Sequence, residues 1–282
     1  MTVTDFEFIC QILRERSGLV LTNDKAYLLE SRLLPVARKY KLATFDELVR
    51  LIRVKSDETI IKDVVEAMTT NESFFFRDTK PFDQFKQIVM PALMKARPNK
   101  TIRIWSAACS SGQEAYSLAM ILTEMSAQLA GWRIEIVGTD LSTEVLNRAK
   151  EGVYSQFEVQ RGLPVSLLVK YFTQSGDRWQ ISQKIRSMVQ YKVFNLLHDP
   201  MVLGKFDVVY CRNVLIYFDQ PTKAKVLAGV ARLMPEDGYL FLGGAETVLG
   251  ISDRFQLLQG QRGIYGLTSA AARAPALGVA GR

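Results

Sequence analysis

One stretch of this 282-residue chain combines polar side chains with aromatic ones in the way that a ligand site does. Asn71, Ser73 and Arg77 lie within the sequence TTNESFFFRD, where the arginine directly follows three phenylalanines. An arginine beside such an apolar cluster needs an anionic partner. Phe74–Phe76 are more typical of core residues than of a platform on which a ligand stacks. We therefore expect the polar residues of this stretch to contact a charged group.

Two further features are typical of a nucleoside site. The loop Ala107–Gly112 has the sequence AACSSG and follows a predicted strand, so small side chains let a ligand approach the backbone. Asp140 ends the next predicted strand, where a carboxylate can accept hydrogen bonds from both ribose hydroxyls of an adenosine. Ser142 can cap the helix that follows, which leaves Asp140 for a ligand. The loop has one glycine, so it lacks the G-x-G-x-x-G pattern and disfavours a nicotinamide dehydrogenase.

These residues require a scaffold, and the pattern after residue 100 supplies one. Strands alternate there with helices, which predicts a mostly parallel, doubly wound α/β sheet. Such sheets bind ligands at the carboxyl edge of their strands. The predicted strands cover residues 101–107, 133–139, 206–211, 238–243 and 263–267.

The rest of the chain divides into four further parts. Residues 4–67 have helical periodicity only, with Asn23, Thr44 and Ser56 as candidate caps. Residues 79–98 form a predicted connecting helix, and a turn at 175–177 predicts a small antiparallel β insertion over about 172–192. The predicted domains are a helical domain at 1–78, a sheet domain at 79–267 and a disordered tail at 268–282.

The composition argues against several classes of protein. The hydrophobic fraction of 48% is ordinary for a globular protein, and no apolar run approaches the length that spans a bilayer. The N-terminus has no basic region before an apolar stretch, so we expect no secretory signal and a cytoplasmic location. The three scattered cysteines predict neither a disulfide framework nor a metal site. Nothing predicts more than a monomer.

The charge is unevenly distributed. The net charge of +7 suits an acidic partner. Residues 1–70 are neutral overall, but 25–41 is basic, and its face is either simply solvated or a docking surface. The basic residues there, set against Glu30 alone, are Lys25, Arg32, Arg38, Lys39 and Lys41.

Six stretches, in this order, together resemble the CheR family of chemotaxis-receptor methyltransferases: TTNESFFFRD, WSAACSSGQEAYSLAM, GTDLS, FNLL, FDVVYCRNVLIYF and GYLFLGGAE. The resemblance runs from about residue 4 to residue 267. It implies an N-terminal helical domain and a Rossmann-like class I methyltransferase domain with a small β subdomain. It also implies transfer of a methyl group from S-adenosylmethionine (SAM) to glutamate carboxylates of chemoreceptors in chemotactic adaptation. The products would be glutamate methyl esters and S-adenosylhomocysteine, and no metal is implied.

The resemblance also implies roles for particular residues. It places Arg77 and Tyr217 beside the transferring methyl group. It places the cofactor among Asn71, Ser73, Arg77, Glu114, Asp140, Asn195, Leu196, Cys211 and Arg212. The acceptor carboxylate is ionised at pH 7, so no general base is required. The only histidine, His198, is predicted to be a solvated loop residue.

The implied partners are the cytoplasmic methylation helices of chemoreceptors, and the implied location is at membrane receptor arrays. Because those helices are rich in glutamate, Arg32, Arg38 and Lys39 are candidate docking residues. In many family members the β subdomain binds a tether at the receptor C-terminus. The short turn at 175–177 argues against dependence on such a tether here.

Two alternatives stay open. The positive charge would suit a nucleic-acid methyltransferase, but the [Asp/Asn]-Pro-Pro-[Tyr/Phe] turn of base amino-methylation is replaced by Cys-Arg-Asn-Val at 211–214. The Pro-Cys nucleophile of carbon-5 methylation is also absent, because Cys211 follows Tyr210. The other alternative is a non-catalytic cofactor-sensing protein with the same fold. The joint presence of all the implied polar residues argues against it.

Overall fold

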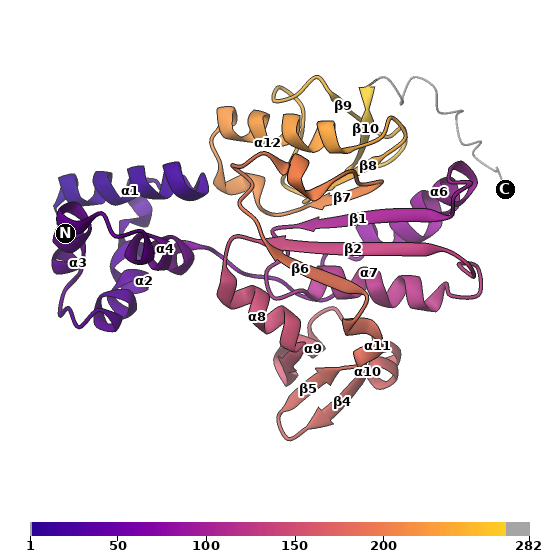
Figure 1. The fold of residues 1–282 in the computed structure, drawn as a ribbon, viewed down its shortest axis with the longest axis horizontal. Coiled ribbons are helices and arrows are strands. Elements are labelled where there is room, and N and C mark those ends of the chain that lie inside the picture. The colour runs from indigo at the N-terminus through magenta and orange to yellow at the C-terminus, as the bar shows by residue number, and fades with distance from the viewer. Residues whose placement is uncertain (1, 269–282) are drawn as a thin grey trace.

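The computed structural model describes residues 2–268. Figure 1 shows a group of N-terminal helices at one end of the molecule and a larger part built around a sheet. Apart from Thr268, the predicted tail lies outside the described residues. No helix among residues 2–268 is both long and apolar enough to cross a bilayer.

The N-terminal domain is all-helical, as predicted, and has its own core. Its elements are α1 (Val3–Ser17), the short 3₁₀ helix η1 (Asn23–Lys25), α2 (Ala26–Lys39), α3 (Phe45–Lys55) and α4 (Glu58–Met68). Buried aliphatic residues at helical spacing, such as Leu29 and Leu33, form this core. Thr44 caps α3 as predicted. Ser56 is also a cap, because it ends α3 in a left-handed conformation with its amide donating to the Ile52 carbonyl. Asn23 is not a cap, since it lies inside η1, and the N-terminal cap of α4 is Asp57.

A helix then runs toward the sheet. It consists of α5 (Lys80–Gln84), a π-helical turn η2 (Phe85–Val89) and α6 (Met90–Ala96), within the predicted span of 79–98. Phe82, Phe85 and Val89 are buried beneath it. This helix joins α7 (Gln113–Glu124) in covering one face of the sheet.

The predicted parallel sheet is confirmed. It has seven strands in the order β6-β2-β1-β7-β8-β10-β9, and the pairs among its first five strands are parallel. Among these seven strands β10 alone runs in the opposite direction, antiparallel to both β8 and β9. The strands are β1 (Thr101–Ala107), β2 (Arg133–Asp140), β6 (Val189–Val193), β7 (Val208–Cys211), β8 (Tyr239–Leu242), β9 (Phe255–Leu257) and β10 (Ile264–Leu267).

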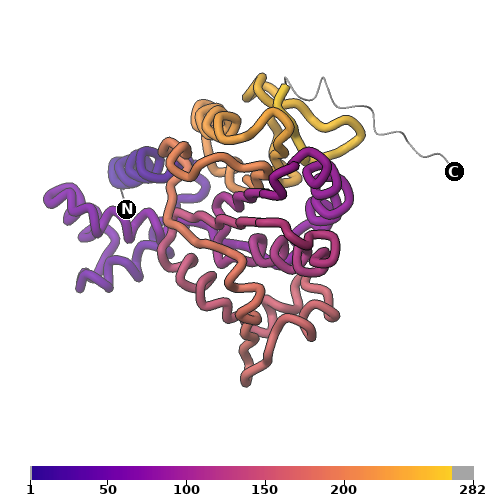
Figure 2. The backbone as a smooth tube through the Cα atoms, turned by 45° about the vertical axis from the view of Figure 1, so that its right-hand side comes forward, coloured from indigo at the N-terminus to yellow at the C-terminus, as the bar shows by residue number. Residues whose placement is uncertain are grey.

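Alternate residues of each strand face opposite sides of the sheet. Ile104, Tyr210 and Phe241 pack on the side of α7, whereas Trp105 and Cys211 pack under α12 (Gln220–Leu233). Figure 1 shows α7 and α12 on opposite sides of the strands. Figure 2 shows the molecule from another direction, with the N-terminal helices (indigo) at one side and the last strands of the sheet (yellow) at the top.

The predicted β insertion is present, with different bounds. β4 (Phe172–Ser175) and β5 (Arg178–Ile181) form a hairpin around Gly176, which has φ +59°. β5 also pairs with β3 (Val153–Ser155), upstream of the predicted range. Three short helices surround this sheet: α9 (Gln156–Gln160), α10 (Val165–Tyr171) and α11 (Gln183–Arg186). β6, inside the predicted range, belongs to the large sheet.

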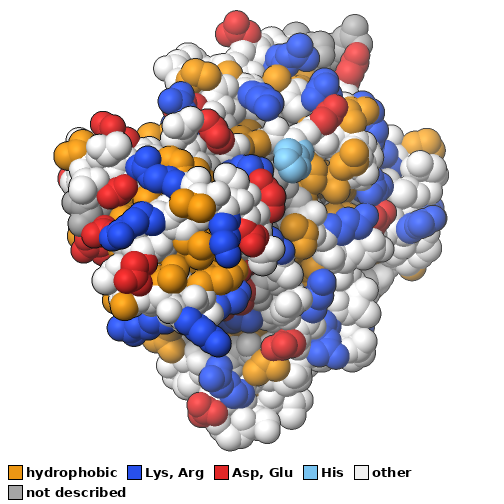
Figure 3. Space-filling view, turned by 60° about the vertical axis from the view of Figure 1, so that its left-hand side comes forward, with side chains coloured by type: hydrophobic (Ala, Val, Ile, Leu, Met, Phe, Trp, Pro, Cys, Tyr) orange, Lys and Arg blue, Asp and Glu red, His pale blue; other side chains and the backbone are white. Residues whose placement is uncertain are grey.

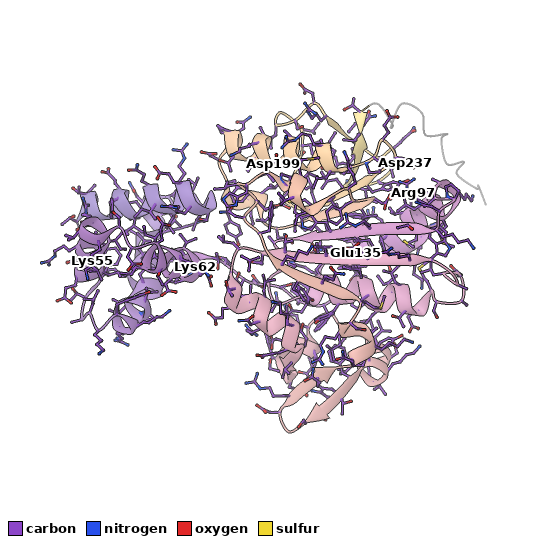
Figure 4. The ribbon with its side chains drawn as sticks, viewed as in Figure 1. Lys55, Lys62, Arg97, Glu135, Asp199 and Asp237 are labelled. Carbon is purple, nitrogen blue, oxygen red and sulfur yellow. The ribbon has the colours of Figure 1, made fainter. Side chains whose placement is uncertain are left out.

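Ion pairs fix the amino ends of the central strands. Arg97, after α6, donates to Asp207 at 2.7 Å and to both oxygens of Asp237 at 2.6 and 2.7 Å. Arg97 lowers the pKa of the Asp237 carboxyl by these hydrogen bonds. Figure 4 shows Arg97 and Asp237 close together at the end of the sheet away from the helical domain. The carboxyl ends of the same strands therefore point toward that domain.

Candidate active site

A cavity lies between the helical domain and the carboxyl edge of the parallel strands. It encloses about 1000 Å³ of empty space, the solvent at its mouth included. Its lining comes from the end of α1, from residues 69–77, from the loop after β1, from the ends of β2 and β6, and from the loop after β7.

The loop after β1 has a strained backbone. Ala108 and Ser110 have φ of +53° and +51°, and Gly112 has φ of +89°. A Cβ at Gly112 would lie 2.5 Å from the Tyr191 hydroxyl, so both its conformation and its surroundings demand glycine. Ser110 uses its amide to donate to Asp140 at 2.8 Å and its hydroxyl to donate to the Asn71 carbonyl at 2.8 Å. The loop thus links the sheet to the segment that enters from the helical domain.

Asp140 lies at the end of β2 and is 6% exposed. Its second oxygen accepts from the Ser142 amide at 3.0 Å, while the Ser142 hydroxyl caps α8 (Thr143–Glu151) as predicted. Burial raises the pKa of the Asp140 carboxyl, and backbone hydrogen bonds oppose this effect in part. Each carboxylate oxygen has a lone pair left for a ligand hydroxyl.

Arg212 and Glu114 form an ion pair beneath the cavity. Arg212 has 1% of its side chain exposed and donates to Glu114 at 2.9 Å, while Glu114 also accepts from the Ser106 hydroxyl. Arg212 donates further to Asp78 at 2.6 Å and to the Arg77 carbonyl at 3.0 Å. Its Nε is buried and has no acceptor among the described residues. A residue that lines the cavity thus has one buried donor without a partner.

Arg77 lines the cavity within the segment that joins the two domains. Its Nη1 donates to the Glu72 carbonyl at 2.9 Å, and its guanidinium lies 5.4 Å from the centroid of the Phe74 ring. Phe75 and Phe76 are buried, as predicted for core residues. For Phe74 the prediction is wrong, because its ring is only half-buried and lies against two arginines, Arg77 and Arg161. Asn71 and Ser73 also line the cavity, and Asn71 donates to the Thr69 hydroxyl at 2.9 Å.

A buried carboxylate holds the loop after β7. Glu246 accepts hydrogen bonds from four backbone amides, those of Asn213, Val214, Ile216 and Gly243, at 2.7 to 3.3 Å. This loop contains the short 3₁₀ helix η4 (Leu215–Tyr217), and Tyr217 lines the cavity. The sequence signal for Glu246 was its place in the GGAE stretch after β8, but its role depends on contacts across the fold.

The helical domain closes one side of the cavity. Ser17 and Leu19, at the end of α1, line it, and the Val20 amide donates to the Tyr217 carbonyl at 2.9 Å. Asn195 also lines the cavity and donates to the Arg16 carbonyl at 2.6 Å. Sequence patterns did not identify the end of α1 as part of the site, because its residues resemble any helix end.

The cavity brings together all the predicted cofactor and catalytic residues except Cys211. Cys211 is fully buried and packs on the α12 side, because the alternation of β7 turns its side chain into the core. Burial raises the pKa values of the Cys109 and Cys211 thiols. His198 is exposed, as predicted. Among residues 2–268, no three metal-ligating side chains cluster together.

The predicted docking residues lie outside the cavity and differ from one another. Arg32 donates to the carbonyls of Met68 and Thr69, and Lys39 pairs with Asp63 at 2.6 Å. Arg38 is exposed and makes no ion pair among the described residues. Figure 3, which brings the helical domain forward, shows basic side chains scattered over this face among hydrophobic and acidic ones.

Comparisons with known proteins agree with this architecture. Residues 71–264 match the family model described as CheR methyltransferase, SAM binding domain, and residues 4–69 match CheR methyltransferase, all-alpha domain. The chain is 40% identical to the chemotaxis protein methyltransferase Cher2 of Pseudomonas putida, over 92% of this chain and 96% of that protein. It is 42% identical to chemotaxis protein methyltransferase 1 of Pseudomonas aeruginosa, with the same coverage.

The chain therefore belongs to the CheR methyltransferase family, and the resemblance seen in the sequence is confirmed. A solved structure, PKMT2 from Rickettsia typhi, shares 16% identity over 61% of this chain and 26% of that one, with a TM-score of 0.38. That likeness is too remote to indicate a substrate.

The lining of the cavity fits the cofactor named by the family model. SAM carries a sulfonium, an amino-acid group and an adenosine. Asp140 has free lone pairs for ribose hydroxyls, and the unpaired Nε of Arg212 can donate to a carboxylate. Leu141, Phe194 and Leu196 give an apolar part of the lining that suits an adenine ring.

We predict that Asp140→Asn weakens SAM binding by about ten- to a hundredfold, the range for losing hydrogen bonds to a charged acceptor. In the wild type, affinity should also fall as the pH drops through the raised pKa of Asp140, because the protonated carboxyl is a poorer acceptor. Calorimetric titration at several pH values measures both effects. The Asn variant, which cannot ionise, is the control and should lack that pH dependence. Equal affinities for the two proteins would exclude Asp140 as a ribose ligand.

Proposed function

We propose that this protein transfers the methyl group of SAM to glutamate side-chain carboxylates of chemoreceptors in chemotactic adaptation. The products are glutamate methyl esters and S-adenosylhomocysteine. The observation that carries the proposal is the match over 92% of the chain to proteins named chemotaxis protein methyltransferases. The cavity supports it, because residues expected to contact cofactor and acceptor lie around one space.

The proposed methyl transfer requires that the acceptor carboxylate be oriented, but it requires no general base. A glutamate carboxylate is ionised at neutral pH, and its oxygen is already a nucleophile. SAM supplies an electrophilic methyl group. Arg77 binds one oxygen of the acceptor carboxylate and aims the other, while Tyr217 borders the same space. Closure by the end of α1 excludes water from it.

The charge of Arg77 sets a limit on its role. A tight ion pair with the acceptor lowers the nucleophilicity of the carboxylate, so Arg77 is proposed to orient the acceptor rather than activate it. Its contacts support an orienting role, because the Glu72 carbonyl and the Phe74 ring hold the guanidinium in place.

Carbon-5 methylation of a pyrimidine is not supported. That reaction requires a cysteine thiolate facing the substrate. Cys211 is buried on the far face of β7, and burial raises the pKa of its thiol. Cys109 lines the cavity, but it is also buried with a raised pKa.

The decisive experiment is to incubate the protein with methyl-labelled SAM and a receptor cytoplasmic fragment, followed by mild base. We expect volatile labelled methanol, which identifies a carboxyl methyl ester. Base-stable label would indicate transfer to nitrogen or carbon, and SAM binding without transfer would favour a cofactor sensor. A second fragment without its C-terminal segment should react equally well, since the two-residue turn between β4 and β5 supports tether independence.

We predict that Arg77→Ala lowers kcat by about a hundredfold at saturating SAM, because the acceptor is no longer held in line with the methyl group. Arg77→Lys should recover part of the rate, since it keeps the charge but loses the planar fork. The Kd for SAM is measured in parallel. A variant that loses SAM affinity but keeps its turnover at saturation would contradict the orienting role.

Arg38 is the proposed docking residue whose side chain makes neither an ion pair nor a hydrogen bond among residues 2–268. We predict that Arg38→Glu raises KM for the receptor fragment by about fivefold, the scale of one exposed charge, and that added salt reduces the difference. Lys55→Glu is the matched control, because Lys55 is exposed at the end of α3 (Figure 4) and should leave KM unchanged. Equal KM values for all three proteins would remove α2 from the docking surface.

A further inference from the structure

A second arginine, Arg161, lies beside Arg77 and contacts Glu72, a residue that lines the cavity. Arg161 directly follows α9, in the insertion, and its Nη2 donates to the Glu72 carboxylate at 2.7 Å. Glu72 lines the cavity, and this pairing lowers the pKa of its carboxyl. The side chains of Arg161 and Glu72 are 41% and 55% exposed. The ion pair is therefore accessible from solvent.

Both arginines lie against the same aromatic ring. The guanidiniums of Arg161 and Arg77 lie 4.2 and 5.4 Å from the centroid of the Phe74 ring. Glu72 contacts both of them, the carbonyl accepting from Arg77 and the carboxylate accepting from Arg161. The two guanidiniums are therefore neighbours against the same ring. They differ in that Arg161 already pairs with a carboxylate, that of Glu72.

The backbone keeps Arg161 in this position. Gly162 has φ of +81°, and a Cβ there would lie 2.1 Å from the Phe75 carbonyl oxygen. The turn at 161–163 therefore packs directly against the backbone of the segment that contains Arg77. The guanidinium of Arg161 has a defined position relative to the cavity, although its side chain is partly exposed.

We propose that Arg161 is a second carboxylate subsite, which binds an acidic residue of the substrate protein next to the methylated glutamate, and that Glu72 occupies this subsite until substrate docks. The inference rests on the proposed function. Glu72 carries the same functional group as the acceptor, so it is an internal competitor for Arg161. An exposed ion pair contributes little free energy, so an incoming carboxylate can replace it at little cost.

The proposal predicts opposite effects for the two members of the pair. Glu72→Gln frees Arg161 and should lower KM for the receptor fragment by about two- to fivefold. Arg161→Ala removes the subsite and should raise KM by a similar factor. In the double variant Glu72→Gln should give no gain, because its benefit requires Arg161. Initial rates of base-released methanol at saturating SAM measure these constants.

Arg148→Ala is the matched control. Arg148 has a similarly exposed side chain and pairs with Glu158 at 3.0 Å, but this glutamate, unlike Glu72, does not line the cavity. Its KM should equal that of the wild type. In a second control, the acidic residues within four positions of the methylated glutamate are changed to glutamine in the substrate fragment. The wild type should have a higher KM for this fragment than for the unchanged one, whereas the KM of Arg161→Ala should be the same for both.

The outcomes separate this inference from the proposed function. If Glu72→Gln raises KM as Arg161→Ala does, the pair only positions residues 71–77 and the subsite is wrong. If Arg161→Ala has the same KM as the wild type, the proposed subsite is also wrong. If the wild type forms no ester, the proposed function fails, and fluorescence anisotropy of the labelled receptor fragment, with the same variants, tests the subsite by Kd. Tighter binding by Glu72→Gln and weaker binding by Arg161→Ala than by the wild type supports the subsite, and equal affinities overturn it.

Discussion

The guanidinium of Arg212 is almost completely buried, so its charge has to be balanced inside the protein. Glu114 on α7 and Asp78 after the phenylalanines provide the two carboxylates, and the Arg77 carbonyl accepts a further hydrogen bond. Removing one partner of a buried pair costs about 3–5 kcal/mol, because the other charge is left without compensation. Three segments far apart in the chain are thereby held in one arrangement beneath the cavity.

Strained backbone is concentrated around the same cavity. Non-glycine residues with positive φ occur in the segment before α5, in the loop after β1 and in the loop after β7: Phe76, Asp78, Thr79, Ala108, Ser110 and Asn213. Such conformations cost about 1–3 kcal/mol each and persist only where other contacts enforce them. Asp140 accepts a hydrogen bond from the Ser110 amide, and Glu246 accepts one from the Asn213 amide. Arg212 donates to the Asp78 carboxylate. Each strained loop is therefore stabilised by a charged side chain from another element.

The distribution of charge suits a reaction between a cationic donor and an anionic acceptor. Asp140 and Glu114 are acidic groups of the lining, and both already accept hydrogen bonds from the protein. Arg77, which is basic, also lines the cavity, and Arg161 lies beside it on the Phe74 ring. Under the proposed function, these arginines would attract an acidic substrate, which favours its approach.

Periodicity and motifs in the sequence determined the helical domain, the alternating strands and helices and the parallel sheet. These features depend on spacings of two and about four residues, which local sequence records. The motifs also identified most of the polar lining, since its residues stand at strand ends where ligands bind.

Only the tertiary structure decided the rest. It showed that Cys211 faces the core, that the end of α1 closes the cavity, and that β3 joins the insertion. It also showed Glu246 holding a loop through four amides, and Glu72 meeting Arg161 across 89 positions of the chain. Such contacts join residues distant in sequence, and their geometry depends on how whole elements pack, which no local spacing records.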